Sequence, residues 1–270
     1  EPFSVIDLFA GALLPGLILV ALYIAWLILT AILRPETCPP YYEEDIKLRH
    51  LSVQIVKAIL PPAFLVVAVL GSILGGLATP TEAASFGGVG ATLLAAVKLQ
   101  LNMKVIKEVI RVTTRISCMV FSILLGASLF SLTFRGFGGD KLVHQFLTGL
   151  PGGFVTAMAV VMLVMFLLGF VLDFIEIVFI VVPIVAPALF AADISPVWLG
   201  VMMAMNLQTS FLTPPFGWAL FYIRGVAPDV IRTPEIYRGV VPFVVIQLIG
   251  LTILAFNPEL ATWLPSKILN

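Results

Sequence analysis

Residues 6–33 form an apolar run of 28 residues whose single charge, Asp7, lies near its start. About 20 apolar residues are enough for an α-helix to cross the hydrocarbon core of a bilayer. Lipid offers no hydrogen-bond partners, so a segment inside it must satisfy its own backbone. The run therefore restricts the chain to a helical membrane protein.

The rest of the chain repeats this pattern. Six further apolar runs follow: residues 56–79, 80–97, 116–134, 154–191, 197–223 and 240–264. The 270 residues are 60% hydrophobic and 11% charged, whereas a soluble domain carries about 25% charged residues. The formal net charge is zero, which gives no electrostatic basis for binding nucleic acid. We expect an all-α integral membrane protein in contact with the lipid bilayer and without a nucleic-acid partner.

The apolar runs and the polar segments between them divide the chain into five units. These are a first span with its cytoplasmic linker (1–55), a two-span unit with a basic amphipathic connector (56–115), a span and periplasmic loop (116–153), a hairpin followed by a broken helix (154–239), and a terminal span (240–270).

The distribution of basic residues predicts the topology. Twelve of the 15 Lys and Arg residues lie in 34–57, 98–115 and 224–238. Cytoplasmic segments carry the excess of Lys and Arg, so we place all three on that side. The chain must then cross an even number of times between the second and third segments. The run 154–191 satisfies this parity if it enters and returns on one side, so we expect a re-entrant helical hairpin. Two full crossings have the same parity, but each arm has only about 18 residues.

Apart from Asp7 and Glu259, which lie near the ends of their runs, three acidic residues lie inside apolar runs: Glu82, Asp173 and Glu176. A charge at the centre of a membrane helix costs at least about 2.5–3.5 kcal/mol, so each is a candidate functional residue. Asp173 and Glu176 are three residues apart, on one helical face at the expected hairpin tip. They form either a cation or proton site or a polar cap that satisfies freed backbone groups. Glu82 follows Thr79 and Pro80, a pattern typical of a helix cap.

The run 197–223 contains the sequence "NLQTSFLTPPFG", which breaks a membrane helix. Pro214 and Pro215 have no backbone N–H, so we expect free carbonyls around Leu212 and, one turn earlier, at Thr209 and Ser210. Such a break survives in a membrane only where protein or a water-filled cavity surrounds it.

The polar groups at this break suggest a transport site. Carbonyl and hydroxyl oxygens suit a hard cation such as sodium, and the N-terminus of the next half-helix suits an anion. Gly217 permits unusual backbone torsions there. Polar side chains are supplied by Asn206, Gln208, Thr209, Ser210 and Thr213. The alternative is a proline kink with ordinary packing polar residues; we favour the transport site because the break is so polar and follows a hairpin.

Motifs of enzymes are missing from the sequence. His50 and His144 are isolated in polar segments, and Cys38 and Cys118 form no metal-ligand pattern. There is no glycine-rich phosphate loop after a strand and no nucleophile elbow. We therefore expect no enzymatic activity, no cofactor and no transition metal.

Several motifs from end to end of the chain resemble the large membrane subunit of the tripartite ATP-independent periplasmic (TRAP) transporters. They are "IDLFAGALLPG" (6–16), "GGLATPTEAASFG" (75–87), "GFVLDFIEIVFIVVPIVAP" (169–187), "NLQTSFLTPPFGWALFYIRGVAP" (206–228) and "VVPF" (240–243). The match begins just past the middle of the family's usual subunit. The resemblance therefore implies a C-terminal half, without the first repeat and its own hairpin.

The resemblance implies more than the residues alone predict. It implies one half of an inverted-repeat, elevator-type secondary transporter of the bacterial inner membrane. It also implies sodium-coupled uptake of a small organic acid, with a small membrane subunit and a periplasmic binding protein as partners. Carried over by position, the sodium site comprises Leu172, Asp173, Glu176, Thr213, Pro214 and Gly217. The substrate site comprises Asn206, Gln208, Thr209, Ser210, Thr213 and Pro215. Two alternatives are a proton-coupled carrier, in which Asp173 or Glu176 titrates, and a membrane scaffold or assembly subunit without its own transport site.

Overall fold

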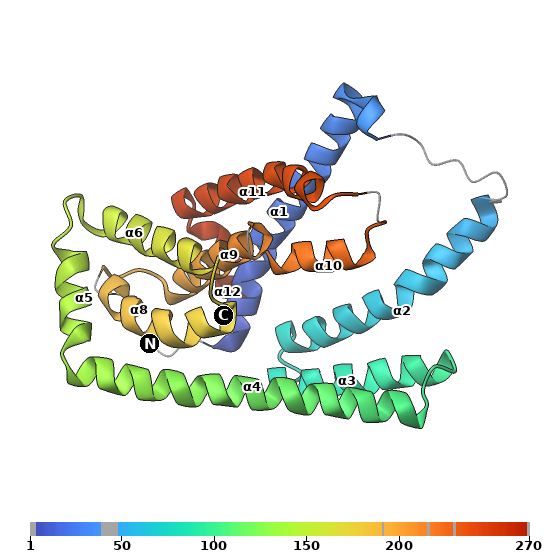
Figure 1. The fold of residues 1–270 in the computed structure, drawn as a ribbon, viewed down its shortest axis with the longest axis horizontal. Helices are drawn as coiled ribbons and strands as arrows, with labels where there is room; N and C mark the ends of the chain where they lie inside the picture. Colours follow the sequence, from blue (N-terminus) through green and yellow to red (C-terminus); the bar gives the residue numbers. More distant parts are fainter. Residues whose placement is uncertain (1–3, 39–47, 191, 215–216, 229–230, 269–270) are drawn as a thin grey trace.

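The computed structural model describes residues 4–38, 48–190, 192–214, 217–228 and 231–268, and all regular structure in these ranges is helical (Figure 1). In chain order the elements are α1 (Val5–Leu33), η1 (Pro35–Thr37), α2 (Leu48–Leu74), α3 (Pro80–Val97), α4 (Met103–Gly136), α5 (Gly139–Thr148), α6 (Gly153–Leu168), α7 (Phe174–Glu176), η2 (Ile177–Val181), α8 (Val182–Phe190), α9 (Pro196–Leu212), α10 (Trp218–Val226), α11 (Thr233–Phe256) and α12 (Glu259–Ile268). The prediction of an all-α fold is confirmed.

Four helices of the described chain are long and apolar enough to cross a membrane. They are α1, residues Ile55–Leu74 of α2, α4 and α11. Their outward faces carry many large exposed apolar side chains, which suit a lipid environment. The fold is therefore that of an integral membrane protein, as predicted.

Helix α4 joins two segments that we expected to be separate. Residues 103–115 of the basic connector and the span at 116–134 lie in one helix of 34 residues. The Asn102 side chain caps its start by accepting a hydrogen bond from the backbone N–H of Val105 at 3.0 Å. No glycine or proline follows until Gly126, so nothing interrupts the helix where the connector was expected to end.

The segment 135–153 is also more ordered than the loop we expected, because α5 occupies its middle. Gly138 and Gly152 precede α5 and α6 with φ of 76° and 98°, respectively. Glycine adopts this left-handed backbone region readily because it has no Cβ. The two glycines therefore set the sharp turns from α4 to α5 and from α5 to α6.

The C-terminal span differs from the expected range 240–264. Helix α11 begins earlier, at Thr233, and ends at Phe256. Asn257 ends it, with its side-chain amide donating to the Ile253 carbonyl at 2.9 Å. Pro258 has no N–H to continue the helix. A separate helix, α12, therefore follows.

The prediction that Glu82 caps a helix is confirmed. Its carboxylate accepts a hydrogen bond from the Thr79 backbone N–H at 2.8 Å. The Thr79 hydroxyl in turn accepts one from the Glu82 backbone N–H at 3.4 Å. This reciprocal pair satisfies two backbone donors at the start of α3, so the acidic residue has a structural role there.

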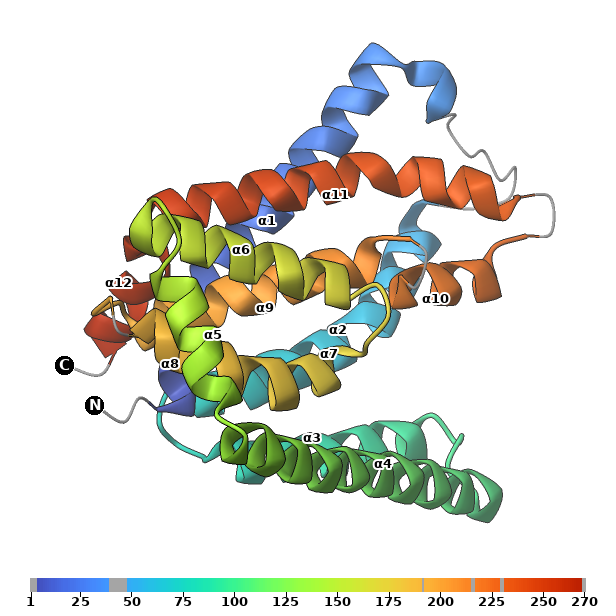
Figure 2. The same cartoon turned by 60° about the vertical axis from the view of Figure 1, so that its left-hand side comes forward.

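Residues 153–190 form two helical arms that run in opposite directions (Figure 2). Helix α6 is the first arm, and α7, η2 and α8 form a continuous second arm. Helix α5 packs against both α6 and α8, so the second arm returns to the side where the first began. The π-helical turn η2 ends at Val181, two residues before Pro183, which has no N–H to bond the carbonyl one turn earlier.

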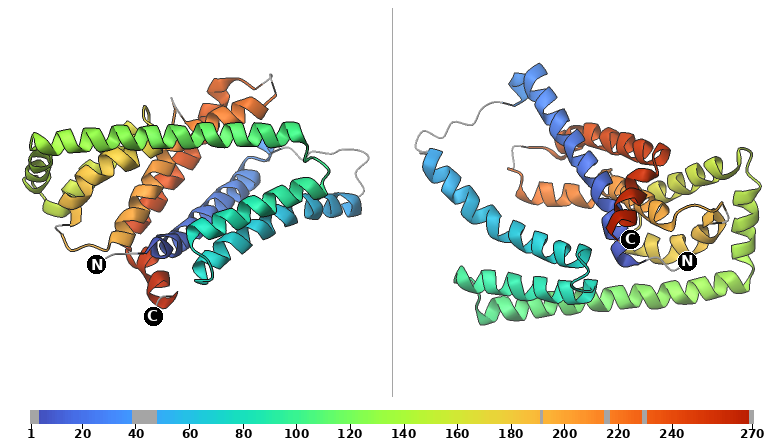
Figure 3. Two further views of the ribbon diagram at one scale, coloured as in Figure 1. Left: turned by 90° about the horizontal axis from the view of Figure 1, so that it is seen from below. Right: turned by 180° about the vertical axis from the view of Figure 1, so that it is seen from behind.

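The core of the molecule surrounds α9. Eleven of its 17 residues are buried, and it packs against α1, α6, α10, α11 and α12. The Trp198 indole N–H donates to the Leu254 carbonyl at 2.9 Å and ties α9 to α11. The α2–α3 pair, by contrast, lies to one side and has few buried residues (Figure 3).

Helices α1, α9 and α12 meet at Gly11. A Cβ on Gly11 would lie 2.6 Å from Val197 Cγ1 and 2.7 Å from the backbone oxygen of Ala261. Ala261 is itself fully buried, so its backbone has no open side to move into. The glycine therefore sets the distance at which the three helices pack.

We expect Gly11→Ala to destabilise the protein by about 1–3 kcal/mol, because the added methyl group overpacks this junction. Gly16→Ala is the matched control on the same helix, since nothing lies within 4 Å of its added Cβ. The measurement is thermal unfolding in detergent. Equal unfolding midpoints for the two variants would contradict the close-packing argument.

Candidate functional site

The helix break after α9 is present in the structure. Helix α9 ends at Leu212, and Thr213 has an extended backbone with φ of −94° and ψ of 130°. The next helix, α10, begins at Trp218 after Gly217, whose backbone N–H donates to the Thr213 carbonyl at 3.1 Å. Pro214 lies in the break, and Pro215 falls outside the described residues. The double proline thus separates two helices, as predicted.

Two carbonyls that we expected to be free each have a hydrogen-bond donor. The Thr213 hydroxyl donates to the Thr209 carbonyl at 2.8 Å. The Thr213 backbone N–H donates to the Ser210 carbonyl at 3.0 Å. Thr213 therefore replaces part of what the prolines remove. Each carbonyl oxygen keeps a second lone pair, and the Thr213 hydroxyl keeps its acceptor capacity.

The polar side chains on α9 divide into buried and accessible ones. Asn206, Thr209 and Ser210 are at most 2% exposed. The Asn206 amide donates to the Met162 carbonyl of α6 at 2.8 Å. The Thr209 and Ser210 hydroxyls donate to carbonyls of α9 itself. These three side chains are thus hydrogen-bonded within the protein, whereas Gln208 faces a cavity.

The turn between the two arms lies against the end of α9. Gly169 ends α6, and a Cβ added to it would lie 2.5 Å from Ser210 Cβ. Leu172 follows in the turn, with its N–H donating to the Leu168 carbonyl at 2.8 Å. The structure therefore places two candidate segments, the hairpin turn and the polar end of α9, in direct contact.

The two acidic residues at the turn have different surroundings. The Asp173 carboxylate accepts a hydrogen bond from the Phe174 backbone N–H at 2.8 Å and caps α7. Glu176 is partly exposed, and its side chain makes no hydrogen bond within the described chain. Of the two interpretations of the acidic tip, Asp173 in this structure fits the polar cap. Among the described residues, no group of three or more His, Cys, Asp or Glu could hold a metal ion.

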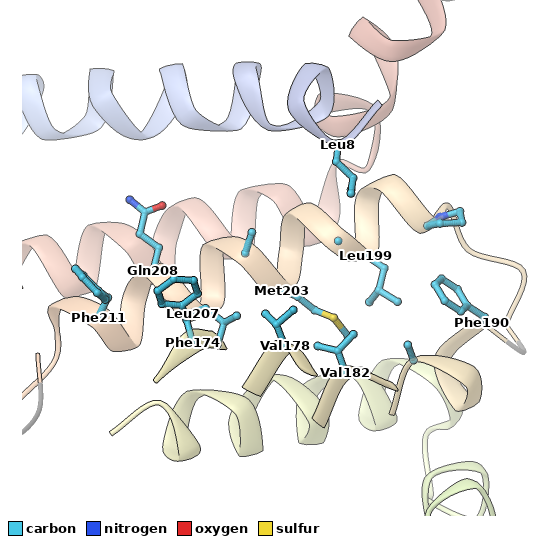
Figure 4. A pocket seen from close by; sticks show the side chains of 14 residues that line it. Leu8, Phe174, Val178, Val182, Phe190, Leu199, Met203, Leu207, Gln208 and Phe211 are labelled. Atoms are coloured by element: carbon cyan, nitrogen blue, oxygen red, sulfur yellow. The ribbon is translucent and has the colours of Figure 1, made fainter. Parts of the chain in front are cut away.

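A cavity of about 620 Å³ lies between α1, the second hairpin arm and α9 (Figure 4). Leu8, Val182, Met203 and other apolar side chains line it, and Gln208 is the polar side chain among them. A carboxylate placed here would have one polar side chain of the lining as a partner, the neutral amide of Gln208. The cavity alone therefore does not supply an anion site, although Gln208 lies close to the break.

Sequence reasoning missed the contact between Gly169 and Ser210 and the hydrogen bond from Asn206 to α6. Gly169 lies in the motif "GFVLDFIE", but the sequence does not show which residue packs against this glycine in space. The resemblance placed Asn206 in the substrate site. The structure places the Met162 carbonyl, rather than open space, opposite its amide nitrogen.

Comparison with known proteins agrees with the family resemblance of the sequence motifs. The sequence model of the family described as tripartite ATP-independent periplasmic transporter, DctM component, matches residues 2–260. The C4-dicarboxylate TRAP transporter large permease protein DctM of Vibrio cholerae is 26% identical, over 99% of this chain and 62% of that protein. A putative TRAP transporter large permease protein of Haemophilus influenzae is 28% identical, over 95% and 62%.

The sialic acid TRAP transporter large permease protein SiaM of Vibrio cholerae is 28% identical, over 76% of this chain and 48% of that protein. The chain thus spans about half to three fifths of the length of the relatives it matches.

We expect Gly169→Ala to destabilise the protein by about 1–3 kcal/mol, because its methyl group would force the hairpin turn away from Ser210. Ser210→Gly should partly restore stability in the double variant, since it removes the clashing Cβ. Gly126→Ala, with open space around its added Cβ, is the control. The measurement is thermal unfolding in detergent. A double variant less stable than Gly169→Ala alone would argue against direct contact.

Proposed function

The chain belongs to the DctM component family of the tripartite ATP-independent periplasmic transporters, and on this basis we propose that it forms part of a sodium-coupled importer of a small organic acid. Membership makes it a multi-pass protein of the inner membrane. The hairpin would then be re-entrant and would move with α9 as a unit in an elevator mechanism. The observation that carries the proposal is the buried end of α9, whose polar terminus lies against the hairpin turn.

We place a sodium site between this turn and the break. Thr213 is its central residue, because its hydroxyl oxygen and main-chain carbonyl both lie where α9 ends. The hydroxyl hydrogen is directed to the Thr209 carbonyl, which leaves the oxygen lone pairs for a cation. Backbone oxygens of Leu172, Asp173, Pro214 and Gly217 would complete this half of the site, with Glu176 contributing charge nearby. Sodium would thus be held mainly by neutral oxygens.

The organic acid would bind beside the sodium ion. The N-terminus of α10 presents the positive end of a helix dipole, which favours a carboxylate. Gln208 would contribute its amide, and Pro215 would shape the loop. Asn206, Thr209 and Ser210 would act mainly by holding the backbone of α9, because their side chains already have partners. This division of roles refines the substrate set expected from the sequence.

The family name describes a transporter of three components, of which this chain matches one. We propose that a small membrane subunit supports the permease and that a periplasmic binding protein delivers the substrate. Relatives carry names that specify C4-dicarboxylate, sialic acid or isethionate transport. These substrates are organic anions of different size, which agrees with substrate selection by a separate binding protein.

We expect Thr213→Val in the full-length permease to raise the sodium concentration for half-maximal uptake about tenfold, which corresponds to about 1.4 kcal/mol. Valine keeps the shape of threonine but removes the hydroxyl oxygen. Thr213→Ser is the matched control, because it keeps that oxygen and should stay near the wild-type value. The assay is uptake into proteoliposomes with the small subunit and the binding protein present. An unchanged sodium dependence in Thr213→Val would remove Thr213 from the site.

Sodium and proton coupling are separated in the same proteoliposomes. We expect no uptake without sodium, even under an inward pH gradient, and we expect Asp173→Asn to keep sodium dependence because an asparagine side chain can still cap α7. Uptake that follows the pH gradient without sodium, and that Asp173→Asn or Glu176→Gln abolishes, would instead establish a proton-coupled carrier. A permease that folds and assembles but gives no sodium-dependent or pH-dependent uptake would support the scaffold alternative.

A further inference from the structure

A charged cavity of about 470 Å³ lies where α4 ends, between α5 and α8. Its polar lining comes from Arg135, Asp140, Lys141, His144 and Gln145, and prolines of α8 close the other side. The lining thus contains two cations, Arg135 and Lys141, together with one histidine and one carboxylate. The side chains of Arg135, Lys141 and His144 make no hydrogen bond or ion pair within the described chain. Their donors are therefore available to an external anion.

A second groove, of about 330 Å³, continues from this cavity along α4. It is lined on α4 from Leu124 to Arg135 and on the hairpin arm by Phe179 and Pro183. Arg135 and Pro183 line both spaces, so the charged cavity and the groove adjoin. Apart from the hydroxyls of Ser128 and Ser131, the side chains before Arg135 are apolar. The combined site has a charged end and an apolar end.

The groove has the length of one lipid tail. Leu124 and Arg135 are separated by 11 helical steps of about 1.5 Å, or roughly 16 Å. One leaflet of the hydrocarbon core is about 15 Å thick, half of about 30 Å. Arg135 lies in the last turn of α4, a helix able to span the membrane. The charged cavity therefore falls at head-group depth when the groove lies within the leaflet.

We propose that this site binds a phospholipid with an anionic head group. Its phosphate would bond to the Arg135 guanidinium, which can engage two oxygens at once, and to the Lys141 ammonium. One acyl chain would lie in the groove between α4 and the hairpin arm. A small organic anion would satisfy the cations but would leave the groove uncovered, so the groove favours a lipid. The site shares no lining residue with the proposed transport site.

The binding experiment uses the full-length permease with its small subunit in detergent, titrated with phosphatidylglycerol and followed by native mass spectrometry. Phosphatidylcholine tests the head-group charge. Inorganic phosphate tests a free anion, and thermal unfolding is measured with phosphate and with phosphatidylglycerol so that their protection can be compared. We expect Arg135→Gln with Lys141→Gln to weaken phosphatidylglycerol binding at least about tenfold, as expected for loss of charge-assisted hydrogen bonds. Arg111→Gln is the matched control, since it removes one charge from the same helix at its other end.

A second variant tests the groove without touching the charges. Ser128 is exposed, so Ser128→Phe should fold while filling the path of the acyl chain. We expect it to weaken phosphatidylglycerol binding and to leave Arg135 and Lys141 unchanged. Equal binding of phosphatidylcholine, equal loss in Arg111→Gln, or normal binding in Ser128→Phe would each overturn the proposal. Protection by inorganic phosphate as strong as that by phosphatidylglycerol would overturn it in favour of a free-anion site.

Discussion

The burial of α9 on nearly all sides is the constraint on which the other elements depend. A helix that ends inside a protein leaves its last carbonyls where water does not reach them freely, so each needs a partner. In this chain Thr213 satisfies two of them, one with its hydroxyl and one with its N–H. The helices around α9 then have to leave room for a polar end in an apolar core. Close packing of the hairpin turn against Ser210 defines that room, and close packing of α1 against Val197 fixes the opposite end of α9.

Some polar groups at the end of α9 hydrogen-bond within the fold, whereas others are left for the proposed binding site. Asn206, Thr209 and Ser210 are polar, yet their hydrogen-bonding groups are directed at backbone carbonyls within the fold. A polar residue on a buried helix can therefore serve to stabilise the packing of the helices instead of binding a solute. In the proposed site, the groups left for a solute would be those at the break itself and Gln208, which lines the neighbouring cavity. Such a site would keep its backbone oxygens rigid, and few side chains would have to move.

The features that were predictable from sequence are those set by local chemistry. The length of the apolar runs predicted the helices, the double proline predicted the end of α9, and "TPTE" predicted the cap at Thr79. Each of these features depends on residues within one or two helical turns. The continuity of α4 was missed, because a change from basic to apolar composition does not interrupt a backbone without glycine or proline. The donors to the Thr209 and Ser210 carbonyls were missed too, since prolines reveal lost N–H groups but not which nearby group compensates. The contact of Gly169 with Ser210 joins residues 41 positions apart and depends on packing alone.

The uninterrupted α4 has a consequence for the membrane around the protein. Its 34 residues extend over roughly 51 Å at about 1.5 Å per residue, whereas the hydrocarbon core is about 30 Å thick. The excess is accommodated when the helix tilts and its first, basic turns lie among the head groups. Because α4 also packs against η2 of the hairpin, its angle to the bilayer normal is tied to the hairpin arm. Hydrophobic mismatch between this helix and bilayers of different thickness would therefore act on the same element that faces the end of α9.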